Sequence, residues 1–197
     1  PLFVLSARLM NAGGITTRLF AFADSAVGFL RGGLAHVNVV GSIIFSGMTG
    51  SALADAAGLG LMEIKAMEEG GYARPFACAV SAATATIGPI FPPSIPMVIF
   101  SMLSGASLGN LFLGGVVPGL LMGAAMMLYI AAAARRRGYP VGRWLGFRAL
   151  LVAFRGAFLA LLTPGILLGG IYSGIFTPTE AGAAAALYAL ILATLVY

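Results

Sequence analysis

Long uncharged apolar stretches dominate the chain and decide its predicted architecture. No charged residue occurs between Arg74 and Arg135, or between Arg155 and Glu180. One crossing of a hydrocarbon core about 30 Å thick takes about 20 apolar residues. The first stretch is therefore long enough for two crossings and the second for one. This pattern predicts an all-α polytopic membrane protein.

Two shorter apolar arms precede the first long stretch. Residues 33–47 and 52–62 flank a tip at residues 49–51, and the second arm contains Asp55. At 1.5 Å per residue the first arm is only about 22 Å long. Because neither arm spans a bilayer comfortably, residues 32–62 are predicted to form a re-entrant helical hairpin whose tip stops inside the membrane.

Basic residues mark the side of the membrane on which each segment ends. Arg31 precedes the hairpin, and Lys65 and Arg74 follow it, so both of its ends are predicted to lie on one side. Residues 135–155 carry six arginines and no acid, which is typical of a cytoplasmic loop. In chain order the predicted segments are the end of a scaffold helix with an amphipathic arm (1–31), the hairpin (32–62), a cytoplasmic turn with a broken transmembrane helix (63–110), a transmembrane helix (111–134), the arginine-rich cytoplasmic loop (135–155) and two transmembrane helices joined near a Thr-Pro-Thr-Glu turn (156–197).

The amphipathic arm covers residues 15–30, where Arg18 and Asp24 stand among apolar side chains. Thr16 is its predicted N-cap. Such a helix suits an arm lying in the membrane interface, and it suits a cytoplasmic connector packed on a neighbour equally well. Residues 1–10 are predicted to be the end of an apolar helix. The chain is expected to start and end within membrane segments, as a fragment does.

Residues 87–96 interrupt an otherwise apolar helical stretch. Four of them are prolines, which lack an amide donor and cannot continue a helix. An unwound stretch at membrane depth survives only if it is buried in protein or lines a cavity, where its carbonyl groups can coordinate a cation. The alternative is a loop at the bilayer surface. Thr84, Thr86 and Ser94 offer further oxygens, although such hydroxyls commonly bond their own backbone.

The hairpin tip is the predicted partner of this unwound stretch. Gly50 and Ser51 permit a tight turn, and the helix that starts near Ser51 points its positive end at the tip, which suits an anionic group. Asp55 is the main acid within the predicted membrane region. A charge placed there costs about 2.5–3.5 kcal/mol on insertion scales, so Asp55 has a functional partner or complements the dipole of its own helix.

Two other polar features carry alternative interpretations. Thr177, Pro178 and Glu180 have the spacing of a capping box, while a substrate or gating contact at Thr177 and Thr179 is the other possibility. His36, near the start of the hairpin, is either structural or a proton relay.

Composition supports a membrane protein and excludes other classes. Hydrophobic residues make up 60% of the chain, charged residues 9%, and the mean hydropathy is +1.01, whereas a soluble domain carries about 25% charged residues. The single cysteine, Cys78, excludes an internal disulfide and a cysteine-rich metal site. The net charge of +5 comes from arginines beside apolar spans rather than from a nucleic-acid-binding patch. Catalysis by Ser173 is rejected, because the only histidine, His36, is predicted on the opposite side.

Four motifs together resemble the large membrane subunit of tripartite ATP-independent periplasmic (TRAP) transporters. They occur in the family's order and extend over nearly the whole chain. The matching segments are GGLAHVNV (32–39), GSALADAAG (50–58), IGPIFPPSIP (87–96) and GGIYSGIFTPTEA (169–181).

The resemblance implies an elevator-type, sodium-coupled importer of organic acids such as C4-dicarboxylates or sialic acids in the bacterial inner membrane. It also implies a periplasmic substrate-binding protein and a small membrane subunit as partners, with sodium as coupling ion and no other cofactor. The family's core has two inverted repeats, and only the first hairpin and broken helix occur here. A passive channel or a scaffold subunit without transport activity is the alternative.

The resemblance and the residue chemistry together give the expected site. Expected substrate-binding residues are Thr49, Gly50, Ser51, Asp55, Ser94, Thr177 and Thr179. Expected sodium ligands are Gly50, Ser51, Gly88, Pro89 and Pro92.

Overall fold

The computed structural model describes Leu5, Leu9 and residues 13–196, except for the side chains of residues 178, 179, 195 and 196. The predicted helix end at residues 1–10 thus lies mostly outside the described residues. Within them the chain is helical and contains no strand, which confirms the all-α prediction. The helices are α2 (Ile15–Val27), α3 (Gly33–Thr49), α4 (Ala52–Glu69), α5 (Arg74–Ala85), α6 (Ile95–Ser104), α7 (Leu108–Arg137), α8 (Phe147–Tyr172), α9 (Pro178–Ile191) and the π-helix η1 (Leu192–Val196).

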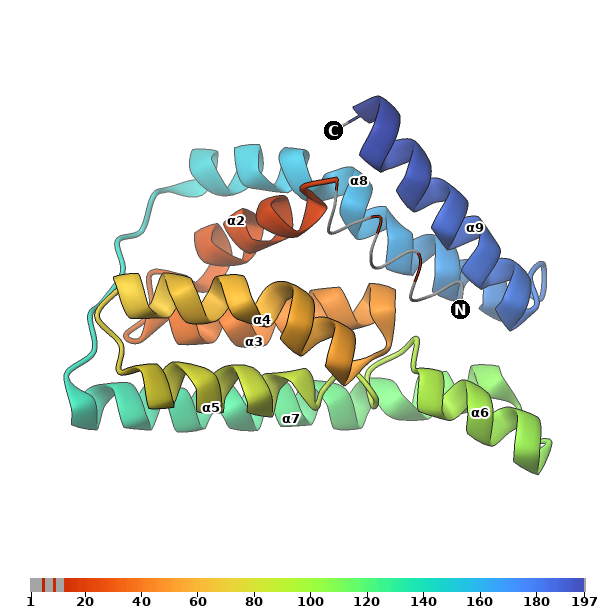
Figure 1. Cartoon of the computed structure of the whole chain (residues 1–197), viewed down its shortest axis with the longest axis horizontal. Coiled ribbons are helices and arrows are strands. Elements are labelled where there is room, and N and C mark those ends of the chain that lie inside the picture. The colour runs from red at the N-terminus through yellow and green to blue at the C-terminus, as the bar shows by residue number, and fades with distance from the viewer. Residues whose placement is uncertain (1–4, 6–8, 10–12, 197) are drawn as a thin grey trace.

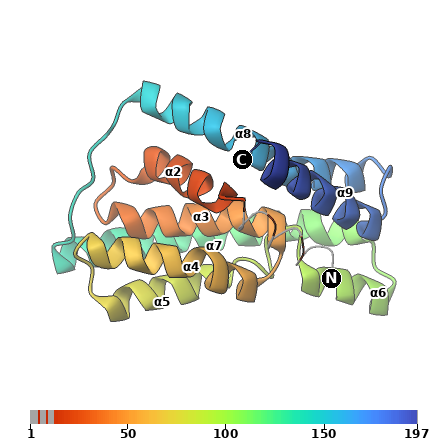
Figure 2. The same ribbon diagram turned by 45° about the horizontal axis from the view of Figure 1, so that its top comes forward.

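The antiparallel pair α3–α4 forms the middle of the bundle (Figure 1). Helices α5 and α7 pack on one side of this pair, and α2 and α8 pack on the other. Helix α9 lies against α8, and α6 lies against the first part of α7. In Figure 2, α2 and α8 again lie on one side of this pair and α5 on the other, while α7 runs behind it. Helix α3 is therefore enclosed by neighbours on several faces.

Two apolar clusters meet at α3 from opposite sides. One joins α3, α5 and α7 through Ala35, Phe76 and Ile130. The other joins α2, α3, α4 and α8 through buried side chains that include Leu19, Phe45, Leu59 and Ala160. Since both faces of α3 are apolar and covered, its polar side chains are confined to the strips between the two clusters.

Helices α7 and α8 are long and apolar enough to cross a membrane. They contain 30 and 26 residues and reach mean hydropathies of 2.0 and 1.9 over their most apolar parts, and at 1.5 Å per residue they are about 45 and 39 Å long. Large apolar side chains such as Leu121, Leu128 and Val152 are exposed along them. Such extensive exposed apolar surface indicates contact with lipid or protein rather than water.

Three boundaries differ from the sequence-based expectations. Gly14, not Thr16, is the N-cap of α2, because the helix starts one residue before Thr16 and Gly14 adopts a left-handed conformation with φ of 69°. Helix α4 continues past Met62 to Glu69, since the intervening residues are mostly good helix formers. The arginine-rich segment is mostly helical as well: only residues 138–146 lie between α7 and α8, because long arginine side chains reach water from a helix without ending it.

Candidate functional site

The turn between α3 and α4 is built by two residues with different roles. Gly50 ends α3 in the left-handed region, with φ of 60°, and its N–H donates to the Ser46 carbonyl at 3.0 Å. Ser51 is extended and caps α4, because its Oγ accepts from the Ala54 N–H at 3.3 Å. The pair thus reverses the chain within two residues, at the position where the sequence predicts the tip.

A second interruption of helix occurs between α5 and α6. Helix α5 ends at Ala85, and α6 begins at Ile95 with Pro96 in its first turn. The residues between them form turns, in which the Gly88 N–H donates to the Ala85 carbonyl at 3.2 Å. Ser94 caps α6 by accepting from the Met97 N–H at 3.3 Å. The predicted break is therefore present.

The hairpin tip and the break are in direct contact. The Ile95 N–H donates to the Gly50 carbonyl at 3.2 Å. A methyl group on Gly88 would stand 3.1 Å from the backbone N of Ala52, so the absence of a side chain lets the break approach the start of α4 closely. The structure thus brings together residues 49–51 with residues 88–94, as the sequence predicts.

Four helix ends converge on this contact. Helices α4 and α6 begin here, at Ala52 and Ile95, while α3 and α5 end here, at Thr49 and Ala85. Helix N-termini carry a partial positive charge and C-termini a partial negative charge. The site therefore offers positive ends to an anion and negative ends to a cation within one small region.

The oxygen atoms predicted to bind ligands differ in whether they already take part in a hydrogen bond. Thr49 Oγ1 is buried and has no hydrogen-bond partner. The Ser94 hydroxyl donates to the Pro89 carbonyl at 2.5 Å, which engages both groups. The described residues contain no group of three His, Cys, Asp or Glu side chains that could hold a metal. Any cation here would be held by hydroxyl and carbonyl oxygens, the donor set that suits sodium at unwound helices.

Asp55 lies one turn into α4 and is buried, at 2% exposure. The Ser42 hydroxyl on α3 is the polar group that interacts with its carboxyl group, but neither carboxyl oxygen has a hydrogen bond of full geometry. The side chain therefore points into the α3–α4 interface, and its predicted role in substrate binding stays a prediction.

A buried polar seam runs along one face of α3 and was not anticipated from sequence. Its members recur at spacings of four, four and three residues, which places them in one row on a helix. They are Asn38, Ser42, Ser46 and Thr49, and all are at most 1% exposed. The spacing of these four residues could have predicted the seam. Taken one at a time, their hydroxyl and amide groups do not predict a buried row.

Asn38 anchors the seam to α5. Its Nδ2 donates to Ser81 Oγ at 2.6 Å, and the Thr84 hydroxyl donates to its Oδ1 at 2.5 Å. Thr84, one of the hydroxyls suggested as a ligand, is thus engaged in holding α5 against α3.

Replacing Asn38 with alanine is expected to lower the free energy of unfolding by about 1–3 kcal/mol, because the buried Ser81 hydroxyl loses the amide that donates to it, while the Thr84 hydroxyl keeps only bonds within its own helix. The measurement is the thermal midpoint of the purified full-length gene product in detergent. Asn110→Ala is the matched control, since Asn110 is exposed at the start of α7. Equal midpoints for the two variants would contradict a stabilising role for the Asn38 network.

The turn before α9 forms the predicted capping box. Thr177 Oγ1 accepts from the Glu180 N–H at 3.4 Å, and the Glu180 carboxylate accepts from the Thr177 N–H at 2.8 Å. Figures 1 and 2 both place the α8–α9 turn apart from the hairpin tip. The side chain of Thr179 lies outside the described part of the chain. A substrate contact at Thr177 and Thr179 stays a prediction.

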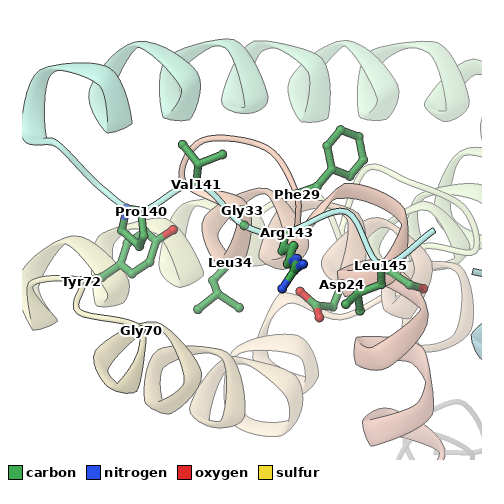
Figure 3. Close-up of a pocket in the computed structure, with 13 residues that line it drawn as sticks. Asp24, Phe29, Gly33, Leu34, Gly70, Tyr72, Pro140, Val141, Arg143 and Leu145 are labelled. Carbon is green, nitrogen blue, oxygen red and sulfur yellow. The ribbon is translucent and has the colours of Figure 1, made fainter. Parts of the chain in front are cut away.

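A separate pocket of about 310 Å³ lies between the end of α2, the start of α3, the turn between α4 and α5, and the segment before α8 (Figure 3). Asp24 and Arg143 line it, and in Figure 3 the arginine side chain points toward the carboxyl group. Burial raises the pKa of Asp24 above its ordinary value. Phe29 and Trp144 meet edge to face beside it, with ring centroids 4.7 Å apart. The pocket is remote in sequence from the tip and shares no lining residue with it.

The described residues form helices only, and their two long apolar helices, exposed apolar flanks and polar contact between interrupted helices are consistent with an integral membrane protein. The model of the DctM component of tripartite ATP-independent periplasmic transporters matches residues 1–197. The chain belongs to this family, as its motifs predict, and the relatives it matches are transporter permeases rather than enzymes.

Curated relatives with different substrates match the chain along its length. It is 51% identical over 197 residues to the sialic acid TRAP transporter large permease protein SiaM of Vibrio cholerae, of which it covers 46%. It is 42% identical to the C4-dicarboxylate large permease DctM of Pseudomonas aeruginosa and 40% identical to the 2,3-diketo-L-gulonate large permease YiaN of Escherichia coli, each over 197 residues and 46% of that protein. The chain thus spans less than half the length of these relatives.

Proposed function

We propose that this chain forms part of a sodium-coupled importer of small organic acids in the bacterial inner membrane. The observation that carries the proposal is the contact between the hairpin tip and the helix break, where the Ile95 N–H meets the Gly50 carbonyl. Interrupted helices that meet in this way form ion and substrate sites in secondary transporters. The names of the relatives, which span sialic acid, C4-dicarboxylates and diketogulonate, support organic acids as the substrate class.

The helix ends at the contact suit both ligands of such a symporter. A substrate carboxylate would lie at the positive starts of α4 and α6, near Ser51 and Ser94. Sodium would lie at the negative ends of α3 and α5, with Thr49, Gly50, Ser51, Gly88, Pro89 and Pro92 as candidate oxygen donors. Binding of the cation would order the tip, which then receives the anion.

The remaining parts of the proposal concern the setting of the chain. Helices α7, α8 and α9 would cross the membrane, and the α3–α4 pair would re-enter it from the cytoplasmic side. The exposed arginines at the end of α7 and the start of α8 would mark that side. A small membrane subunit and a periplasmic binding protein would be the partners. The hairpin-bearing part would then move across the membrane as an elevator.

Uptake into proteoliposomes tests the proposal. The full-length gene product and its small membrane subunit are reconstituted, and accumulation of radiolabelled sialic acid and succinate is measured with and without a sodium gradient and the binding protein. Accumulation against a gradient that needs both is the expected result. Equilibration that needs neither would favour a passive channel instead.

Ser51→Ala and Asp55→Ala are each expected to reduce sodium-dependent uptake by about tenfold or more, since 1.4 kcal/mol of lost binding corresponds to a factor of ten. Membrane insertion should persist. Ser104→Ala is the matched control, because Ser104 is exposed and bonds the Phe100 carbonyl at the far end of α6. The dependence of initial uptake rate on sodium concentration is the measurement. Unchanged sodium dependence in both variants would refute this placement of the site.

A further inference from the structure

Glu63 is a buried carboxyl group that the proposed transport site does not use. It lies on α4 eight residues after Asp55, so the two share one helix face about 12 Å apart along the axis. Its side chain is 1% exposed, and its Oε1 has no hydrogen-bond partner. Ordinary surface glutamates on the same helix, by contrast, form exposed ion pairs: Glu69 with Lys65 at 4.0 Å, and Glu68 with Arg74 at 3.2 Å.

The α3 backbone leaves a notch for this carboxyl group. A methyl group on Gly41 would stand 2.9 Å from Glu63 Oε1 and 3.1 Å from the Leu59 side chain. The oxygen therefore points at the bare backbone of α3 rather than toward the outside of the bundle. The apolar side chain of Leu59 separates Glu63 from Asp55 on their common face.

The described residues of α3 and α5, the helices that pack most closely on α4, offer Glu63 no free cation. Within the described residues, α5 contributes Arg74, which is exposed and paired with Glu68, and the exposed Cys78. Helix α3 contributes His36, whose Nδ1 has no hydrogen-bond partner. The remaining titratable groups of α4 are the exposed Lys65–Glu69 pair, Glu68 and Asp55. The charge that acts on Glu63 is that of Asp55, and it is of the same sign.

A carboxylate that is buried without a cation is strongly unfavourable, and such a group takes up a proton instead. Within the described residues, no group of three His, Cys, Asp or Glu side chains gathers around Glu63 to hold a metal ion in place of the proton. The like charge of Asp55 acts in the same direction as burial, because it disfavours a second negative charge on Glu63.

We propose that Glu63 is a proton-binding site inside the α3–α4 pair and that it holds its proton at neutral pH. The protonated carboxyl group keeps the interface with α3 closed and allows the pair to lie in an apolar medium without a bare charge. Loss of the proton places a charge against Gly41 and separates the two helices. The assignment goes beyond the proposed transport activity, and it can be measured without it.

Infrared spectroscopy of the reconstituted full-length gene product tests the assignment. A protonated carboxyl group gives a carbonyl stretching band that a carboxylate lacks. The expected result is such a band at neutral pH that disappears in Glu63→Gln, persists in Glu69→Gln and declines as the pH is raised. A band that is present in Glu63→Gln, or no protonated carboxyl band in the wild type, would overturn the assignment.

Chemical modification gives a measurement on the unchanged protein, in case Glu63→Gln does not fold. Dicyclohexylcarbodiimide modifies protonated carboxyl groups in apolar surroundings, and mass spectrometry locates the adduct. Modification of Glu63 at neutral pH that falls with rising pH is expected. If sodium at constant pH prevents both the adduct and the infrared band, Glu63 binds sodium rather than a proton, and the assignment is wrong. Failure of uptake with the band intact would leave this assignment standing and refute only the transport proposal.

Discussion

Gly50→Ala is expected to abolish uptake by the full-length gene product while the protein still reaches the membrane. Gly50 has a φ of 60°, which a residue with a side chain adopts at a cost of about 1–2 kcal/mol. An added methyl group would also collide with the Pro93 carbonyl oxygen and stand 3.1 Å from the Ile95 N. These are backbone atoms that cannot rotate away. The chain must open the tip, which breaks the hydrogen bond between Ile95 and Gly50 and costs about a further 1–3 kcal/mol.

Gly105→Ala is the control that separates the conformational cost of Gly50→Ala from its steric collision. Gly105 ends α6 with a φ of 73°, but a methyl group there meets no atom within 4 Å. This variant carries the conformational cost without the collision, and its uptake should stay close to that of the wild type. Initial rates in proteoliposomes, normalised to the amount of inserted protein, give the comparison. Equal losses in the two variants would show that the tip–break contact is not required for transport.

Gly119→Leu is expected to have the second-largest effect, although the residue lies on α7 and outside the proposed site. Gly119 is buried, and a methyl group on it would stand 2.9 Å from the Phe91 ring and 3.4 Å from the Phe91 Cα. A leucine would push the helix break away from α7. Overpacking of this kind costs about 1–3 kcal/mol, and the displaced break could no longer meet Gly50.

Gly114→Leu is the matched control for this substitution. It lies on the same helix, is exposed, and has no atom within 4 Å of an added methyl group. The two variants therefore have the same composition and differ only in the face of α7 that carries the leucine. Uptake and thermal midpoint should both fall in Gly119→Leu and should stay at the wild-type values in Gly114→Leu. A loss of uptake in both variants to the same extent would indicate that α7 has no specific role in supporting the break.

The local features of the candidate site could be predicted because each has a local physical cause. Pro89, Pro92 and Pro93 stand within five residues, and each lacks an amide donor and clashes with the preceding turn. A helix continues through the single prolines Pro118 in α7 and Pro164 in α8, but not through this group, so its position predicted the break. Gly50 and Ser51 together supply a left-handed helix end and an N-cap. The capping box at Thr177 and Glu180 is equally local. None of these features depends on distant parts of the chain.

Glu63 shows why the remainder could not be predicted in the same way. In sequence it stands two residues before Lys65 and six before Glu69, which indicates the end of an apolar arm and an aqueous turn. In the structure α4 continues through it to Glu69, and the helix rotation turns Glu63 toward Gly41 while Lys65 stays exposed. Whether a charged residue on a helix is buried depends on which face the partner helix covers, and that is a property of packing.

The sequence by itself determined that the chain is an all-α membrane protein, where its helices are interrupted, and to which family it belongs. The length of the apolar stretches, the positions of proline and glycine, and the order of the motifs can each be read from neighbouring residues without knowledge of the packing. Only the tertiary structure decided which backbone groups join the tip to the break, that a polar seam of α3 lies buried, and that Glu63 lies buried against Gly41. Those facts depend on the rotation and approach of helices packed side by side, which are fixed by contacts such as those of Gly41 and Gly88 with residues far away in the chain.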